Sequence, residues 1–157
     1  MNTRLFLESV LALGLLLVAS RSTRAADAEG TRLTAQLLWG TNGEKPAGQD
    51  LKAVAKDLEQ RLRRIFKWQK YFEIERKDFV AHRAKPAILD LSKECRLEVA
   101  SLGSEEFEIQ LFGKGVLVVK KRQRIVPGEA VVLGGDDKND NAWFVVVSLA
   151  KGSDAQK

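Results

Sequence analysis

From Tyr71 to the end of the chain, apolar and polar residues alternate with a period of two, which is the spacing of β-strands with one buried face. The connections between these segments, such as residues 112–115 and Pro127-Gly128, are too short to hold crossover helices. The pattern therefore predicts a predominantly antiparallel meander. Its expected strands are YFEIER, a run near Phe79 and Val80, AILDLS, ECRLEVASL, EFEIQLF, GVLVVKKRQRIV, AVVLG and AWFVVVSL.

The segment DLKAVAKDLEQRLRRIF, residues 50–66, predicts one amphipathic helix, because its apolar residues recur every three or four positions. Asp50 is the expected N-cap. The preceding segment RLTAQLLWG, residues 32–40, predicts a first strand. A helix packed on the dry face of a sheet of about six to eight strands makes α+β the expected fold class.

The first residues have the pattern of a secretory signal peptide. Arg4 gives a positive start, the apolar run from Val10 to Ala19 follows, and small residues come next. The run is about half the ~20 residues that a membrane-spanning helix needs. We expect cleavage after Ala25, with Ser20 and Ala28 as alternatives. The sequence thus predicts an exported protein, periplasmic or extracellular, without a transmembrane helix after cleavage.

Removal of residues 1–25 leaves 132 residues, which suits a single domain. We expect a flexible segment at 26–31, one α+β domain over 32–150 and a disordered tail at 151–157. The leader holds three arginines and one glutamate, so its loss lowers the net charge from +5 to +3. Such an excess suits an anionic envelope polymer or membrane surface, and it is too small and too spread for a dedicated nucleic-acid binder.

The only cysteine, Cys95, can form no internal disulfide. It alternates in phase with Leu97 and Val99, which puts its sulfur on the apolar side of a strand. We therefore predict a buried, unreactive thiol. With His82 as the only histidine and no spaced set of nucleophile and base, the sequence predicts no catalytic site, no cofactor and no zinc site.

The acidic segment GGDDKNDN separates the last two predicted strands. Asp137, Asn139 and Asn141 stand at i, i+2 and i+4, as in the opening of a calcium loop. The pattern then fails, because an alanine replaces the turn glycine and a serine replaces the bidentate glutamate. A hairpin loop is the favoured interpretation. A calcium loop or a cation-dependent activity at 136–141 is the alternative.

Three cations, Lys120, Arg122 and Arg124, fall on one side of a predicted strand. Together with Arg96 they are candidate binding residues, because they could form an anion-binding stripe on the wet face of the sheet. At an edge they would instead discourage aggregation between sheets.

A second basic stretch, residues 61–77, interleaves cations with aromatic residues, as single-stranded nucleic-acid sites do. Export argues against nucleic acid as the ligand, and helix and strand periodicity assign most of the aromatics to the core. Trp68 and Tyr71 are left at the corner between helix and strand, and they remain candidate binding residues.

The layout as a whole resembles small, uncharacterised exported proteins of bacteria. The segments that carry the resemblance are LLWGTN, the helix DLKAVAKDLEQRLRRIFKWQKYFEI, and the closing strands PGEAVVLGG and AWFVVVSL. It implies a compartment and a fold but no residue roles. In addition, GEAVVLGG is similar to a hairpin of outer-membrane secretin domains, although the leucine that usually follows the second glycine is missing. That similarity implies a role in envelope assembly.

These observations favour a non-catalytic exported module that binds another envelope protein, or an anionic envelope polymer, through the wet face or an edge of its sheet. One alternative is a protein that binds anions or membrane surfaces through the basic sheet face and residues 61–77. The other is the cation-dependent loop. The oligomeric state stays open.

Overall fold

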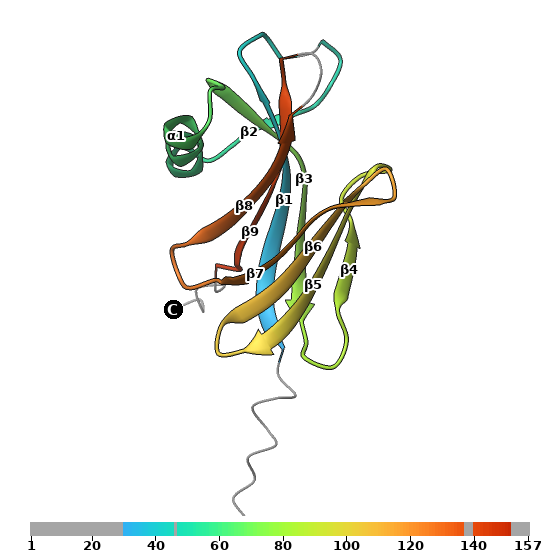
Figure 1. The fold of residues 1–157 in the computed structure, drawn as a ribbon. Helices are drawn as coiled ribbons and strands as arrows, with labels where there is room; N and C mark the ends of the chain where they lie inside the picture. The colour runs from blue at the N-terminus through green and yellow to red at the C-terminus, as the bar shows by residue number, and fades with distance from the viewer. Residues whose placement is uncertain (1–29, 46, 137–139, 152–157) are drawn as a thin grey trace, which may run out of the picture.

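The computed structural model describes residues 30–45, 47–136 and 140–151, which form two antiparallel sheets packed face to face (Figure 1). The five-stranded sheet has the order β2 (Lys52–Ala53), β3 (Lys70–Ala81), β1 (Thr31–Thr41), β9 (Ala142–Leu149), β8 (Ala130–Asp136). The four-stranded sheet has the order β4 (Ala87–Asp90), β5 (Cys95–Gly103), β6 (Glu106–Gly113), β7 (Val116–Arg124).

The expected α+β class is wrong, because the structure is mostly β, with 59% of the described residues in strands and 9% in the helix. The alternation of apolar and polar residues shows that each strand has one buried side, but it does not show how many sheets the strands form. The chain changes sheet twice, in the connections 82–86 and 125–129, so the second sheet covers the dry face that we had assigned to the helix.

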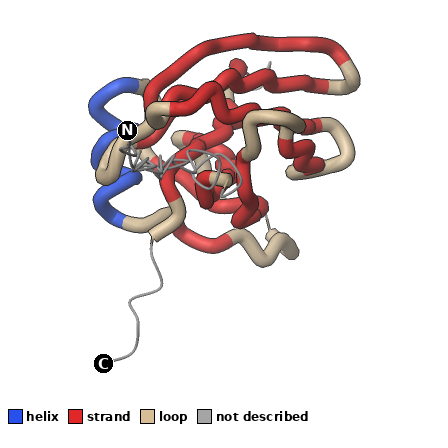
Figure 2. Tube along the Cα trace, turned by 90° about the horizontal axis from the view of Figure 1, so that it is seen from below, coloured by secondary structure: helices blue, strands red, loops and turns tan. Residues whose placement is uncertain are grey.

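The helix α1 spans Lys56–Ile65 and is shorter than predicted. Lys52 and Ala53 pair with β3 as a short strand, so Asp50 is not the N-cap. Ala55 takes that position and makes no side-chain capping hydrogen bond. In Figure 2 the helix lies at one side of the strands. No helix within the described residues is long and apolar enough to cross a membrane.

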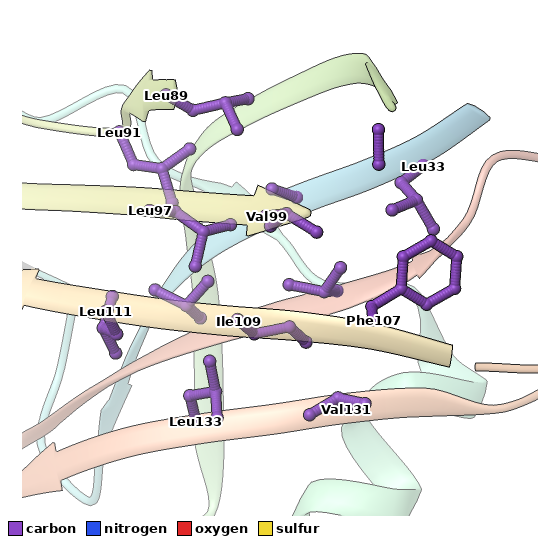
Figure 3. Close-up of a cluster of buried hydrophobic side chains, with 14 of the residues drawn as sticks. Leu33, Leu89, Leu91, Leu97, Val99, Phe107, Ile109, Leu111, Val131 and Leu133 are labelled. Carbon is purple, nitrogen blue, oxygen red and sulfur yellow. The ribbon is translucent and has the colours of Figure 1, made fainter. Parts of the chain in front are cut away.

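The main core lies between the two sheets and is built from alternate residues of their strands (Figure 3). Each Val, Leu, Ile or Phe side chain among them contributes about 1.5–3 kcal/mol when fully buried. The five-stranded sheet supplies Leu33, Ala35, Leu37, Val131, Leu133, Val145 and Val147, and the strands of the four-stranded sheet supply Leu89, Cys95, Leu97, Val99, Phe107, Ile109 and Leu111.

A second, smaller core covers part of the other face of the five-stranded sheet. There α1 contributes Leu62, and Phe144 lies at the centre of the aromatic contacts, 4.6 Å from Phe66 between ring centroids. Gly40 of β1 packs against these rings, and a Cβ added to it would lie 2.9 Å from a ring carbon of Phe144. Strands β1 and β9 are therefore buried on both faces along much of their length, which explains the continuous apolar run of β9.

Replacing Ile109 by alanine should lower the free energy of unfolding by about 2–5 kcal/mol, because its side chain is fully enclosed between the sheets. The matched control is Ile88→Ala, whose side chain is 60% exposed and which should cost less than about 1 kcal/mol. Urea denaturation measures both. Equal losses would contradict the assignment of the core to the space between the sheets.

Candidate functional site

Strand β7, at one edge of the four-stranded sheet, is the longest largely exposed edge strand among the described residues. Within the described residues β7 pairs only with β6 and ends the strand order of its sheet. Seven of its nine residues are exposed. Its length corresponds to about 30 Å. The strands that end the other sheet edges are shorter: β2 has two residues, β4 has four and β8 has seven. Strand β3 is longer and β2 covers only Phe72 and Glu73 of it, but five of its twelve residues are exposed, against seven of nine in β7.

The backbone of β7 directs hydrogen-bonding groups away from the sheet at alternate residues. The Ile125 N–H donates to the Glu105 carbonyl at 2.9 Å, in register with the pair Phe107 and Gln123. Hydrogen-bonded and non-bonded pairs alternate in an antiparallel ladder. The N–H and C=O groups of residues 120, 122 and 124 therefore point outward, where another strand could bind them.

The first residues of β7 are exposed and apolar. Val116 is 67% exposed, and Leu117 and Val118 are each 47% exposed. Val116 pairs with Gly113 and Leu117 with Phe112, which lie on opposite faces of the sheet, so apolar surface is open on both sides of this end; the register then shifts at Val118. Adjacent exposed apolar side chains of this kind are typical of interaction sites.

The second half of β7 carries the predicted cations, and carboxylates of the same sheet contact three of them. Lys120 and Arg122 both reach Glu108, at 2.9 and 3.2 Å, and Arg124 reaches Glu105 at 2.8 Å. The hydrogen bond from Lys120, aided by that from Arg122, lowers the pKa of Glu108. Lys120, Lys121 and Arg122 thus have one contacting carboxylate between them, whereas Arg124 contacts Glu105, lies opposite Glu106 in the ladder and is also influenced by the charge of Glu129.

Arg96, the fourth residue of the predicted stripe, lies on β5, on the same face as the three cations but separated from them by β6. Its Nε donates to Asp90 of β4 at 2.8 Å. Each of the four residues is therefore engaged by a carboxylate of its own sheet, and the stripe does not form a patch of free cations.

Trp68 and Tyr71 are buried in the smaller core against Phe144. The indole Nε1 of Trp68 donates to the Asp140 carbonyl at 2.9 Å. Burial raises the pKa of the Tyr71 hydroxyl. The structure thus places both residues in the core, where they expose almost no surface to a ligand.

The acidic hairpin can be followed only at its end, because Asp137 and Asn139 lie outside the described residues. Asn141 is half-buried just before β9. Asp140 has a φ of 58°, a turn conformation, and its carboxylate accepts from Lys67 at 3.0 Å. The described residues contain no group of three or more His, Cys, Asp or Glu side chains that could hold a metal ion.

A pocket of about 340 Å³, which we did not predict from the sequence, lies on the outer face of the five-stranded sheet, beside α1 and the connection from β7 to β8. Thr34 and Gln36 line it, and both are buried. The Thr34 hydroxyl donates to Asp78, and the Gln36 amide donates to Glu73, each at 2.6 Å.

The charges around this pocket balance each other. Its lining includes the cations Arg61, Arg76 and Lys151 and the anions Asp57, Asp78 and Glu129. Burial opposes ionisation of the neighbouring Glu73, but hydrogen bonds from Arg76 and Gln36 outweigh it and lower its pKa. The pocket therefore favours no sign of ligand charge. In the sequence, the polar residues that line it have the pattern of an ordinary solvent-facing side of a strand. The pocket forms only because the tertiary fold places α1 beside them.

The comparisons with known proteins give no relative. No protein-family model matches the chain, and neither a curated protein nor a solved structure is significantly similar to it. Any function must therefore be argued from the geometry of the β7 edge and the pocket.

Cys95 is buried on the core face of β5, as its alternation with Leu97 predicts. Burial raises the pKa of its thiol to about 11 from an ordinary value of 9.0. At pH 8 the native thiol should therefore react with iodoacetamide about 100-fold more slowly than the same thiol in urea-unfolded protein, since the thiolate is the nucleophile. Equal rates would contradict the burial of Cys95.

The same shift predicts a pH dependence of stability. The folded protein holds this proton more tightly than the unfolded chain, so its contribution is fully present below pH 9 and is lost as the pH rises towards 11. Cys95→Ala should remove this part of the alkaline decline in the free energy of unfolding.

Proposed function

We propose that this protein is an exported, non-catalytic binding module that holds an extended segment of another envelope protein along β7 as an additional strand. The observation that carries the proposal is the exposed nine-residue edge of β7, which has no second partner strand among the described residues. Addition of a strand to an open sheet edge is a common mode of peptide recognition, in which backbone hydrogen bonds supply affinity and side chains supply specificity.

The backbone of β7 supports this mode of binding. The outward N–H and C=O groups of residues 120, 122 and 124 match the donor and acceptor spacing of an incoming strand. Each bond formed contributes about 0.5–1.5 kcal/mol net. Burial of Val116, Leu117 and Val118 would add apolar area at one end.

The compartment is proposed from the sequence alone. The positive start, the short apolar run and the small residues up to Ala25 support export. A periplasmic or extracellular protein would meet envelope proteins as partners.

Peptides selected from a displayed library of nine-residue sequences should bind the purified protein and should lose affinity in the double variant Lys120→Pro, Arg122→Pro. Proline removes two outward N–H groups without touching the pairing with β6, and such positions at an edge accept proline. The loss of two hydrogen bonds predicts weakening of at least about fivefold, measured by isothermal titration calorimetry.

The matched control is Lys120→Ala, Arg122→Ala, which removes the same charges and keeps the backbone donors. Circular dichroism and urea denaturation check that both variants stay folded. The proposal fails if the proline and alanine variants bind equally well, or if the library yields no ligand.

A further inference from the structure

Resting on this proposed function, we infer that the partner segment runs antiparallel to β7 and is acidic in its first half and apolar in its second half. The open backbone of β7 alone does not specify the chemistry of the partner segment. The division of charge and apolar surface along the nine residues of β7 does.

Three cations line one face of β7 beside its outward backbone groups. Lys120, Arg122 and Arg124 occupy alternate positions of the outer sheet face. A strand added to this edge would place its own alternate side chains about 5 Å from theirs. Carboxylates at those positions of the added strand would form ion pairs with the cations of β7, as Glu108 does from the neighbouring strand β6. Cations at those positions would be repelled by the cations of β7.

The charge excess on β7 leaves room for added carboxylates. Lys120 and Arg122 share a single carboxylate, that of Glu108. Lys121 faces the opposite side of the strand, is exposed, and forms no ion pair within the part of the chain that the structure describes. The three cations at positions 120–122 therefore outnumber the carboxylates that contact them, whereas Arg124 is compensated by Glu105 and by Glu106 opposite it.

The apolar half of β7 requires a different partner chemistry. Val116, Leu117 and Val118 expose apolar surface on both faces of the strand. The incoming segment must therefore bring apolar side chains at consecutive positions there, and only a segment with both halves satisfies the whole edge.

A second copy of this chain does not satisfy the edge. Full-length antiparallel pairing of β7 with itself places Lys120 opposite Lys120 and Val116 opposite Arg124. Like charges directly opposite one another are destabilising, and the apolar end would face cations. The cations thus disfavour self-association while they favour an acidic partner.

The direction of the partner follows from the sheet it joins. All strand pairs among the described residues are antiparallel, and antiparallel pairs are slightly more stable per residue than parallel pairs. Read from its own N-terminus, an antiparallel partner meets Arg124 first and Val116 last, so its acidic half comes first.

The test uses four capped synthetic peptides and fluorescence anisotropy at low salt. The acidic probe is Glu-Thr-Glu-Thr-Glu-Val-Val-Ile-Val, and the others replace Glu by Gln, replace Glu by Lys, or reverse the order of residues. We expect the acidic probe to bind at least about threefold more tightly than the Gln probe, given three new cross-strand ion pairs. The Lys probe should not bind, and the reversed probe should bind more weakly.

Two protein variants complete the test. In Lys120→Glu, Arg122→Glu the preference should invert in favour of the Lys probe, whereas Lys120→Pro, Arg122→Pro should weaken binding of the acidic probe beyond the loss seen with the matched alanine pair. Analytical ultracentrifugation of the free protein should give a monomer at micromolar concentration. A dimer that the proline pair dissociates would overturn the choice of an acidic partner over a second copy.

The outcomes separate this inference from the proposed function. If the Gln probe binds as tightly as the acidic probe and the proline pair abolishes both, the acidic chemistry is wrong and strand addition stands. If the reversed probe binds more tightly, the direction is wrong. If no probe binds although the peptide library yields a ligand, the inference alone is overturned. If the proline pair changes nothing, both the inference and the proposed function are overturned.

Discussion

The packing of two sheets through one apolar core is the interaction on which the rest of this structure depends. The inner faces of β5 and β6 bury Leu97 and Ile109 against Leu37 and Val145 of the five-stranded sheet. Because each sheet covers the other, the short helix α1 is not needed as a cover and packs at the outer face through Leu62. The same arrangement leaves sheet edges at the sides, where function can be built.

The functional proposal follows from one of these edges. An open edge is usually protected by charge, and β7 carries four cations. That protection is incomplete, because Val116, Leu117 and Val118 remain exposed at the other end of the strand. Charge and apolar surface on the same edge exclude some strands and accept others, which is what specific binding requires. The pocket beside Thr34 and Gln36 has balanced charges and gives no comparable selection.

Local patterns predicted most of the strands and their buried sides, because alternation depends only on neighbouring residues, but β3 runs unbroken over Lys70–Ala81 where two strands were expected. Cys95 and Phe107 face the core as their phase required. The number of sheets was not predictable in this way, since it is decided by the two connections in which the chain changes sheet. The edge position of β7 and the pairing of its cations with Glu108 depend on strand order, which alternation does not encode. The helix α1 begins later than its periodicity predicts, because Lys52 and Ala53 pair with β3 as a short strand.

Amide hydrogen exchange along β7, followed by NMR, tests the central claim most directly. In the free protein the account predicts fast exchange at residues 120, 122 and 124 and slow exchange at 121 and 123, whose N–H groups pair with β6. Binding of an acidic extended peptide should slow the fast group and leave the slow group unchanged. Uniform protection of all five amides in the free protein, or no slowing on addition of peptide, would contradict the account.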